Sequence, residues 1–366
     1  MPLVAASNLP TFERLRAEGA TVLPTEFAER QDIRGLHIGL LNMMPDAALQ
    51  ATERQFFRLI GESNQIAQFY VHPFTLDELP RGPTGREHVE RYYERFDTIA
   101  EQGLDALIIT GANVNQPDLA LEPFWDPLKR VVDWAFENVT STLCSCLATH
   151  AVMQARFGEK RVPRVVRFSD LEPGQEKLWG VFSHRLTNRA HPLVAGMNTR
   201  FDVPHSRYND ISAEQFERHE LEVLAKTASD DVHLAVSPDG FRLVFFQGHP
   251  EYDIISLLKE YKREVGRFFA GQRGEYPPFP DHYFSRRSMA ILDEYADRAH
   301  HAHSRGRELP QFPEPLLLEA LDNTWHDSAL AVMNNWIGNV YQITNLDRRR
   351  PFRDEIDPAD PLGQRS

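Results

Sequence analysis

The stretch Val139–Gln154 reads VTSTLCSCLATHAVMQ and contains both cysteines of the chain, Cys144 and Cys146. Its first half is rich in β-branched residues, which favours a strand, and its second half has the apolar spacing of a helix. A strand that leads directly into a helix is the repeating unit of α/β proteins. The stretch therefore predicts an α/β fold, with Cys146 at the point where the strand becomes the helix.

Two other segments repeat the strand-then-helix pattern. Residues 36–41 form an apolar run that precedes a helical pattern opened by Pro45. Residues 106–110 form a second apolar run, followed by a helical pattern over 124–138. Apolar strands of this kind are typical of parallel sheets that are buried on both faces, so we expect a mostly parallel sheet covered by helices. In such sheets, functional residues gather at the carboxyl ends of the strands.

The composition is that of a globular protein. The chain has 366 residues, of which 42% are hydrophobic and 25% are charged. Its net charge of −13 argues against a nucleic-acid surface, which would need clustered basic residues. No apolar run reaches the roughly 18–20 residues of a membrane helix, and we expect no signal peptide at the N-terminus. Because the C-x-C spacing is a poor disulfide framework, we expect a reducing, cytoplasmic location.

Cys146 is a candidate nucleophile because of its place before a helix. The positive end of a helix favours a thiolate, which is the reactive form of cysteine. The backbone N–H of Leu147 would also be free to stabilise a developing oxyanion. The alternative is that both cysteines are buried core residues, which is the commoner fate of cysteine. We interpret Cys144 as a core residue, because it cannot share the end of the strand with Cys146.

A candidate base and its partner follow a predicted hairpin. The turn sequence Pro238-Asp239-Gly240 separates two β-rich runs, and the second run, 242–246, ends just before His249 and Glu251. Histidine can take a proton from a thiol, and a carboxylate can hold the imidazole ring and stabilise its charged form. With Cys146 they would form a nucleophile, a base and an orienting acid. The alternative is a turn histidine near a solvated glutamate, which would not explain their place after a buried strand.

The rest of the chain predicts one domain with peripheral additions. We expect a single domain over residues 1–345, with a core at about 33–270 and a closing helix at about 325–343. Residues 271–316 are polar and rich in proline, so we interpret them as an insertion. The charged segment 346–366 has the composition of a flexible tail.

A histidine cluster inside the insertion raises the question of a metal site. The cluster contains His300, His301 and His303, but no cysteine or carboxylate at ligand spacing accompanies them. We therefore interpret it as a solvated, histidine-rich loop and expect no metal site.

Several motifs resemble, in chain order, the homoserine O-acyltransferases of the MetA type. The resemblance extends to about Tyr341 and is carried by DIRGLHIGLLNMMPDAALQATERQFFRLIG, DALIITGA, NVTSTLCSC, EKLWGVFSH, VPHSRY, GHPEYD and NNWIGNVYQ. It implies the flavodoxin-like fold of the class I glutamine amidotransferases, with a mostly parallel sheet and helices on both faces. It also implies an enzyme that takes an acyl group from acyl-coenzyme A as a cysteine thioester and passes it to the hydroxyl of homoserine.

The resemblance implies roles for individual residues of this chain. Cys146 matches the nucleophile, His249 the general base and Glu251 its partner. An arginine can bind the carboxylate of an amino acid with two hydrogen bonds, and a lysine and a hydroxyl can supply further donors. Acyl-coenzyme A would be a co-substrate, with no permanently bound cofactor. Three further residues match positions that bind substrate: Lys177, Ser206 and Arg263.

The chain departs from the family pattern at two places. After the nucleophile the family usually has Trp-Gly-Ala-Gln, whereas this chain has Leu147-Ala148-Thr149-His150. Asn115 stands at the position that governs the acyl donor, where enzymes using acetyl donors typically have Glu and those using succinyl donors have Gly. A neutral Asn115 would not repel the carboxylate of a succinyl group. We therefore predict a homoserine O-succinyltransferase of methionine biosynthesis, with the O-acetyltransferase as the alternative.

Two functions of other classes stay open at this point. A cysteine hydrolase or glutaminase of the same fold would use the same three residues, although such glutaminases usually have glycine on both sides of the nucleophile. A catalytically inactive binding module would be expected to lack at least one of the three. We expect small-molecule partners, L-homoserine and acyl-coenzyme A, no nucleic acid or membrane, and a dimer, which is common among such enzymes.

Overall fold

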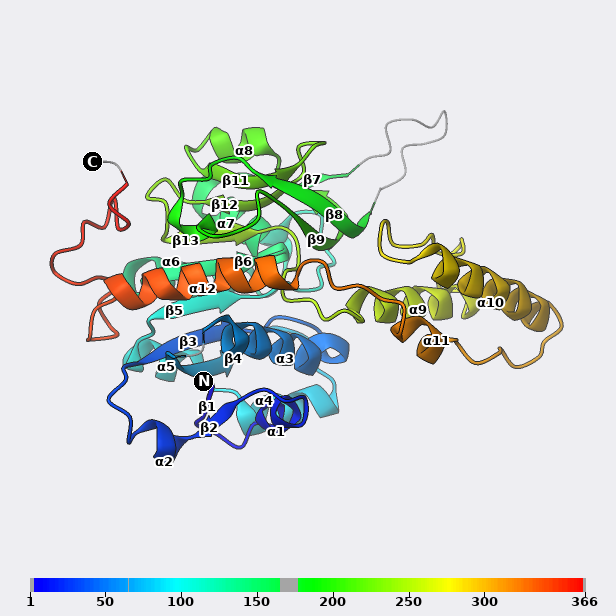
Figure 1. Cartoon of the computed structure of the whole chain (residues 1–366), viewed down its shortest axis with the longest axis horizontal. Helices are drawn as coiled ribbons and strands as arrows, with labels where there is room; N and C mark the ends of the chain where they lie inside the picture. Colours follow the sequence, from blue (N-terminus) through cyan, green and yellow to red (C-terminus); the bar gives the residue numbers. More distant parts are fainter. Residues whose placement is uncertain (1–2, 65, 165–176, 365–366) are drawn as a thin grey trace.

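The computed structural model describes residues 3–64, 66–164 and 177–364 of the chain, and its centre is one large twisted sheet (Figure 1). Within these residues the strands lie in the order β2-β1-β4-β3-β5-β6-β13-β12-β11-β8-β9. Their bounds are β1 Leu3–Ala5, β2 Val22–Pro24, β3 Gly35–Leu41, β4 Gln68–Phe74, β5 Ala106–Ile109, β6 Ser141–Ser145, β8 Leu178–Leu186, β9 Arg200–Arg207, β11 Glu222–Thr227, β12 Val232–Val236 and β13 Leu243–Phe246.

The sheet has a parallel half and an antiparallel half. From β2 to β13 in the sheet order, neighbouring strands pair in parallel, whereas β12, β11, β8 and β9 pair antiparallel. The predicted hairpin is confirmed as β12 and β13, and its second strand pairs in parallel with β6, Phe246 opposite Ser145. The ends of β6 and β13 therefore meet, which brings two distant parts of the sequence together.

Helices cover both faces of the sheet, as the sequence predicted. Alternate residues of β5 enter different cores, Ile108 on one face and Ile109 on the other. The first core lies under α3 (Asp46–Ser63) and α12 (His326–Ile343), and the second under α6 (Trp125–Asn138) and α7 (Leu147–Phe157). The other helices of the main body are α1 Pro10–Ala17, α2 Thr25–Ala28, α4 Pro83–Tyr92, α5 Phe96–Gln102 and α8 Ala213–Glu217.

The predicted insertion, residues 271–316, contains helix α10 (Arg286–Ser304) and the start of α11 (Glu314–Leu318). Together with α9 (Ser256–Phe269), which precedes the insertion, these helices form an arm that extends from the main body, at the right of Figure 1. The arm has its own core, in which Tyr261 packs near Leu292 of α10.

The histidine cluster lies on a helix, so the interpretation as a loop is wrong. His300, His301 and His303 belong to the last turns of α10, and the ring of His300 packs against Phe269 at 5.2 Å between ring centroids. One apolar stripe of α10 is buried although the segment as a whole is polar, and this stripe stabilises the helix. In the described part of the chain, no group of three or more His, Cys, Asp or Glu side chains is arranged to hold a metal ion.

The segment after Asn345 folds back along the sheet. Thr140 donates a hydrogen bond to the backbone oxygen of Pro351, and the side chain of Phe352 is buried in the first core. The predicted flexible tail is thus in contact with the main body up to at least Phe352.

None of the helices in the described ranges is long and apolar enough to cross a membrane.

Candidate active site

Cys146 lies in a strained turn between β6 and α7. Its backbone has φ 53° and ψ −111°, a left-handed conformation that costs a residue other than glycine about 1–3 kcal/mol. The backbone N–H of Cys146 donates to the oxygen of Phe246 at 2.7 Å, and the hydroxyl of Thr149 donates to the oxygen of Cys144 at 2.9 Å. These bonds hold the turn, so the direction of the Cys146 side chain is set by the backbone.

A glycine lies beside the turn that carries Cys146. Gly111 follows β5, and a Cβ atom at this position would lie 3.8 Å from Cβ of Cys146 and 3.9 Å from the backbone nitrogen of Leu147. Leu147 is the first residue of α7, so its N–H has no partner within the helix. The amide of Leu147 and Cβ of Cys146 thus border the same space beside Gly111, where the sequence predicts an oxyanion donor. That role remains a prediction.

His249 and Glu251 lie on the loop that follows β13. Nδ1 of His249 is 2.8 Å from Oε1 of Glu251, and the backbone N–H of His249 donates to the oxygen of Pro204 at 2.8 Å. The ring of Tyr252 stacks on the imidazole, with 4.3 Å between ring centroids and 15° between the planes. Carboxylate, backbone and aromatic ring together fix the orientation of His249.

The electrostatics of this group favour a charged imidazole beside the sulfur. Burial by itself would lower the pKa of His249, but the charges of Cys146 and Glu251, and hydrogen bonds to both side chains, raise it to about 10. A histidine with this pKa carries its proton at neutral pH. The structure thus brings Cys146, His249 and Glu251 into one hydrogen-bonded chain. Cys144 differs, since it is fully buried and burial raises the pKa of its thiol.

The three predicted substrate-binding residues surround a carboxylate that sequence reasoning missed. Glu260, on α9, accepts a hydrogen bond from the hydroxyl of Ser206 at 2.7 Å. It also lies 3.5 Å from Nζ of Lys177 and 3.5 Å from a guanidinium nitrogen of Arg263. The indole N–H of Trp179 donates to its second oxygen at 2.8 Å. Burial would raise the pKa of Glu260, but Lys177 and these hydrogen bonds lower it, so the group is ionised at neutral pH.

Tyr252 connects the two groups. Its ring stacks on His249, and burial raises its pKa together with the negative charges of Glu260, Glu251 and Cys146. The hydroxyl of Tyr252 is thus within electrostatic reach of the sulfur and of the Glu260 cluster.

Asn115 lies on the exposed loop that begins at Gly111. The backbone N–H groups of Asn115 and Gln116 donate to Oε1 of Glu122, at 2.5 and 2.6 Å. Glu122 therefore fixes the course of this loop, which leaves the same end of the sheet as Cys146. The effect of Asn115 on the acyl donor remains a prediction.

His150, which departs from the family pattern, is part of the packing. It is buried in α7, and its Nε2 lies 3.0 Å from Oε1 of Gln247. Burial lowers the pKa of His150 to about 4, so it is neutral at physiological pH. We assign it no proton transfer.

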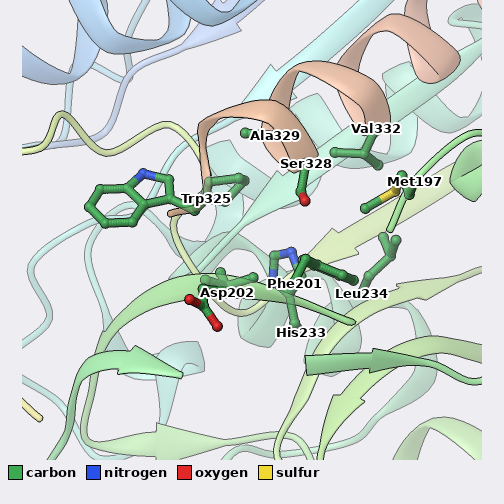
Figure 2. A pocket seen from close by; sticks show the side chains of 11 residues that line it. Met197, Phe201, Asp202, His233, Leu234, Trp325, Ser328, Ala329 and Val332 are labelled. Carbon is green, nitrogen blue, oxygen red and sulfur yellow. The ribbon is translucent and has the colours of Figure 1, made fainter. Parts of the chain in front are cut away.

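A small cavity lies next to the loop that carries His249 (Figure 2). It is lined by Pro250 of this loop, by residues of β9 and β12, and by the first turns of α12. The lining is mainly apolar, and Trp325 beside it donates its indole N–H to the backbone oxygen of Tyr252 at 2.9 Å. This cavity belongs to the packing that supports the loop.

Two comparisons of the sequence with known proteins agree on one family. A family model described as homoserine O-succinyltransferase matches residues 2–346. Proteins named homoserine O-succinyltransferase from Thioalkalivibrio nitratireducens and Nitrosococcus oceani are 70% and 64% identical, and each alignment covers at least 99% of both chains. A solved glutamine amidotransferase from Thermotoga maritima has a TM-score of 0.45 and 10% identity, covering 84% of this chain and 98% of that one. Because this structural similarity is low, the fold assignment rests on the sheet topology described above.

Proposed function

The chain belongs to the homoserine O-succinyltransferase family, and on that premise we propose that it transfers a succinyl group from succinyl-coenzyme A to L-homoserine through a thioester on Cys146. The observation that carries the mechanism is the hydrogen-bonded chain of Cys146, His249 and Glu251 at the ends of β6 and β13. The enzyme is an acyltransferase of methionine biosynthesis.

In the first half-reaction the sulfur of Cys146 attacks the thioester carbonyl of the acyl donor. The negative charge that forms on the carbonyl oxygen is stabilised by the backbone N–H of Leu147. The tetrahedral intermediate then expels coenzyme A, whose thiolate takes the proton carried by His249. The products are a succinyl thioester on Cys146, free coenzyme A and a neutral imidazole.

In the second half-reaction the neutral imidazole of His249 takes the proton from the hydroxyl of homoserine. The oxygen attacks the thioester, and the O-succinyl ester leaves as the Cys146 thiolate re-forms. Glu251 stabilises the imidazolium that results, as its 2.8 Å contact with Nδ1 allows. The cycle ends with the charges it began with. Because the protein's own residues and the two substrates supply every proton and every leaving group, no bound cofactor is required.

The acceptor would bind at Glu260. Its carboxylate suits the α-ammonium of an amino acid, while Lys177 and Arg263 suit the α-carboxylate. The hydroxyl of Ser206 would take part as a further donor. Since Lys177 and Arg263 already lie beside Glu260, homoserine would replace part of an existing ion cluster rather than enter an unpaired one. A cytoplasmic location and a dimeric state remain predictions.

The test uses purified protein, L-homoserine, and either succinyl- or acetyl-coenzyme A. Release of free coenzyme A and the mass of the product are followed, and initial rates are measured over both substrate concentrations. We expect turnover with succinyl-coenzyme A and parallel double-reciprocal lines, which mark a ping-pong mechanism. Turnover with acetyl-coenzyme A alone would contradict the donor assignment. Hydrolysis of the thioester without ester formation would favour a hydrolase instead.

A further inference from the structure

Arg161 is bound to the loop that carries Asn115. It follows α7, and its Nη2 donates to the backbone oxygens of Gln116 at 2.9 Å and Pro117 at 3.4 Å. These oxygens come directly after Asn115, on the loop whose first residue, Gly111, lies beside Cys146. One side of the guanidinium is thus fixed to the loop next to the nucleophile.

Arg161 has no acidic partner among the residues that the structure describes. None of the ion pairs in this part of the chain includes it, and its Nε is buried without a hydrogen-bond partner there. Its basic neighbours differ, because Lys160 pairs with Asp118 and Arg164 pairs with Asp210 and Asp231. Lys177 and Arg263 are likewise occupied by Glu260. Among the described residues, Arg161 is therefore a cation on the Asn115 loop that has donors left for a ligand.

The positive charge of Arg161 interacts with the negative charge of Cys146. Burial lowers the pKa of Arg161, and the negative charges of Glu122, Asp118 and Cys146 act in the opposite direction. Glu122 is already engaged by two backbone N–H groups, and Asp118 by Lys160 and Gln154. The geometry agrees with this, because the loop held by Arg161 begins at Gly111, beside Cys146.

We propose that Arg161 binds the free carboxylate of the succinyl group and thereby selects a dicarboxylic acyl donor over acetyl. In a succinyl thioester, two methylene groups separate this carboxylate from the carbonyl attacked by Cys146. A carboxylate brought into a half-buried site needs a charged partner, and an arginine supplies paired donors in a matching plane. Asn115 would then only permit the charged group, while Arg161 attracts it. The proposal rests on the proposed function above.

The experiment compares Arg161→Gln with the wild-type enzyme. The ratio of kcat/KM for succinyl-coenzyme A to that for acetyl-coenzyme A is measured with saturating homoserine. We expect this ratio to fall about 100-fold in Arg161→Gln, mainly through succinyl-coenzyme A, while KM for homoserine stays within about twofold. Arg161→Lys keeps the charge but loses the paired geometry, so its ratio should be intermediate.

A matched control is Lys160→Gln, which removes the adjacent cation that is already paired with Asp118. Its donor ratio should equal that of the wild-type enzyme. An unchanged ratio in Arg161→Gln, or an equal loss with both donors, would overturn the proposal, since equal loss would mean that Arg161 only supports the loop. Should Arg161→Gln fail to fold, the ratio in Arg161→Lys decides in the same way. If the wild-type enzyme itself does not succinylate homoserine, the proposed function fails, and the role of Arg161 fails with it.

Discussion

The two halves of the sheet position their side chains in different ways. In the parallel half, Cys146 and His249 are placed by backbone geometry, at a strained turn and on a loop bonded to a neighbouring strand. In the antiparallel half, Lys177 and Ser206 are placed by a shared partner, Glu260 of the adjacent helix. The first arrangement keeps a reacting group rigid, whereas the second holds charges that a ligand can replace. We therefore expect substitutions in the first half to impair both half-reactions, and substitutions in the second half to impair only transfer to homoserine.

The largest effect is expected for Cys146→Ala. Without the sulfur no thioester forms, so kcat should fall at least about 10⁴-fold. Intact-protein mass after mixing with succinyl-coenzyme A should show a succinylated wild-type enzyme and an unmodified variant. A variant that keeps turnover within about tenfold of wild type would remove Cys146 from the mechanism.

The next effect is expected for Glu251→Gln. The amide cannot balance the imidazolium, so kcat should fall about 10²–10³-fold. Because a negative charge beside the ring is lost, the pKa of His249 should drop below its value of about 10, and the ring should lose its proton at lower pH. NMR titration of the His249 ring measures this directly, and an unchanged pKa would contradict the assigned partnership.

The raised pKa of His249 also makes the stability of the folded protein depend on pH. The pKa of His249 is about 10 in the folded protein, above its ordinary value of 6.5. Its protonation therefore stabilises the folded state fully below pH 6.5, and this contribution is lost as the pH rises through about 10. In Glu251→Gln the loss should be complete at a lower pH. Urea unfolding at a series of pH values would show the difference.

A smaller and more selective effect is expected for Glu260→Gln. The variant keeps the hydrogen-bonding shape but loses the charge that would bind the α-ammonium, so KM for homoserine should rise about 10–100-fold. Release of coenzyme A in a single turnover without homoserine should stay within about twofold of wild type. Equal impairment of both half-reactions would contradict the expectation that the antiparallel half of the sheet serves only the transfer to homoserine.

The smallest effect on activity is expected for Cys144→Ala. Cys144 is fully buried two residues before the nucleophile, and its side chain faces the core under α6 and α7. Removing the sulfur should cost about 1–2 kcal/mol of unfolding free energy while turnover stays within about twofold. Chemical unfolding and the coenzyme A assay measure the two quantities. A large loss of turnover in a stable variant would show that Cys144 also supports catalysis.

Sequence patterns were sufficient where a segment is buried on both faces. The apolar runs at 36–41 and 106–110 became β3 and β5, because strands covered on both sides are rich in apolar residues, and the β-branched run that begins at Val139 became β6. The resemblance to homoserine O-acyltransferases is likewise confirmed by the family match. Helix α10 was missed because most of its residues are exposed, although the spacing of Leu292, Tyr295 and Ala299 already describes a buried stripe.

Two polar residues to which we assign roles by proposal could not be found by local reasoning. Glu260 lies in a charged helical segment, KEYKREV, which looks like a solvated helix face until β8 and β9 bring Trp179 and Ser206 against it. Arg161 is held by backbone oxygens 44 and 45 residues earlier in the chain. Backbone oxygens leave no mark in a sequence, so only the fold reveals such a partner.

The left-handed backbone of Cys146 also bears on how this protein responds to selection for heat resistance. A glycine at this position would adopt φ 53° without strain, so the fold alone favours Cys146→Gly, a substitution that removes the reactive sulfur. Screens that reward only survival of the folded chain would be drawn to this residue and would return stable, inactive proteins. Efforts to stabilise the enzyme against heat should therefore measure turnover and melting temperature together.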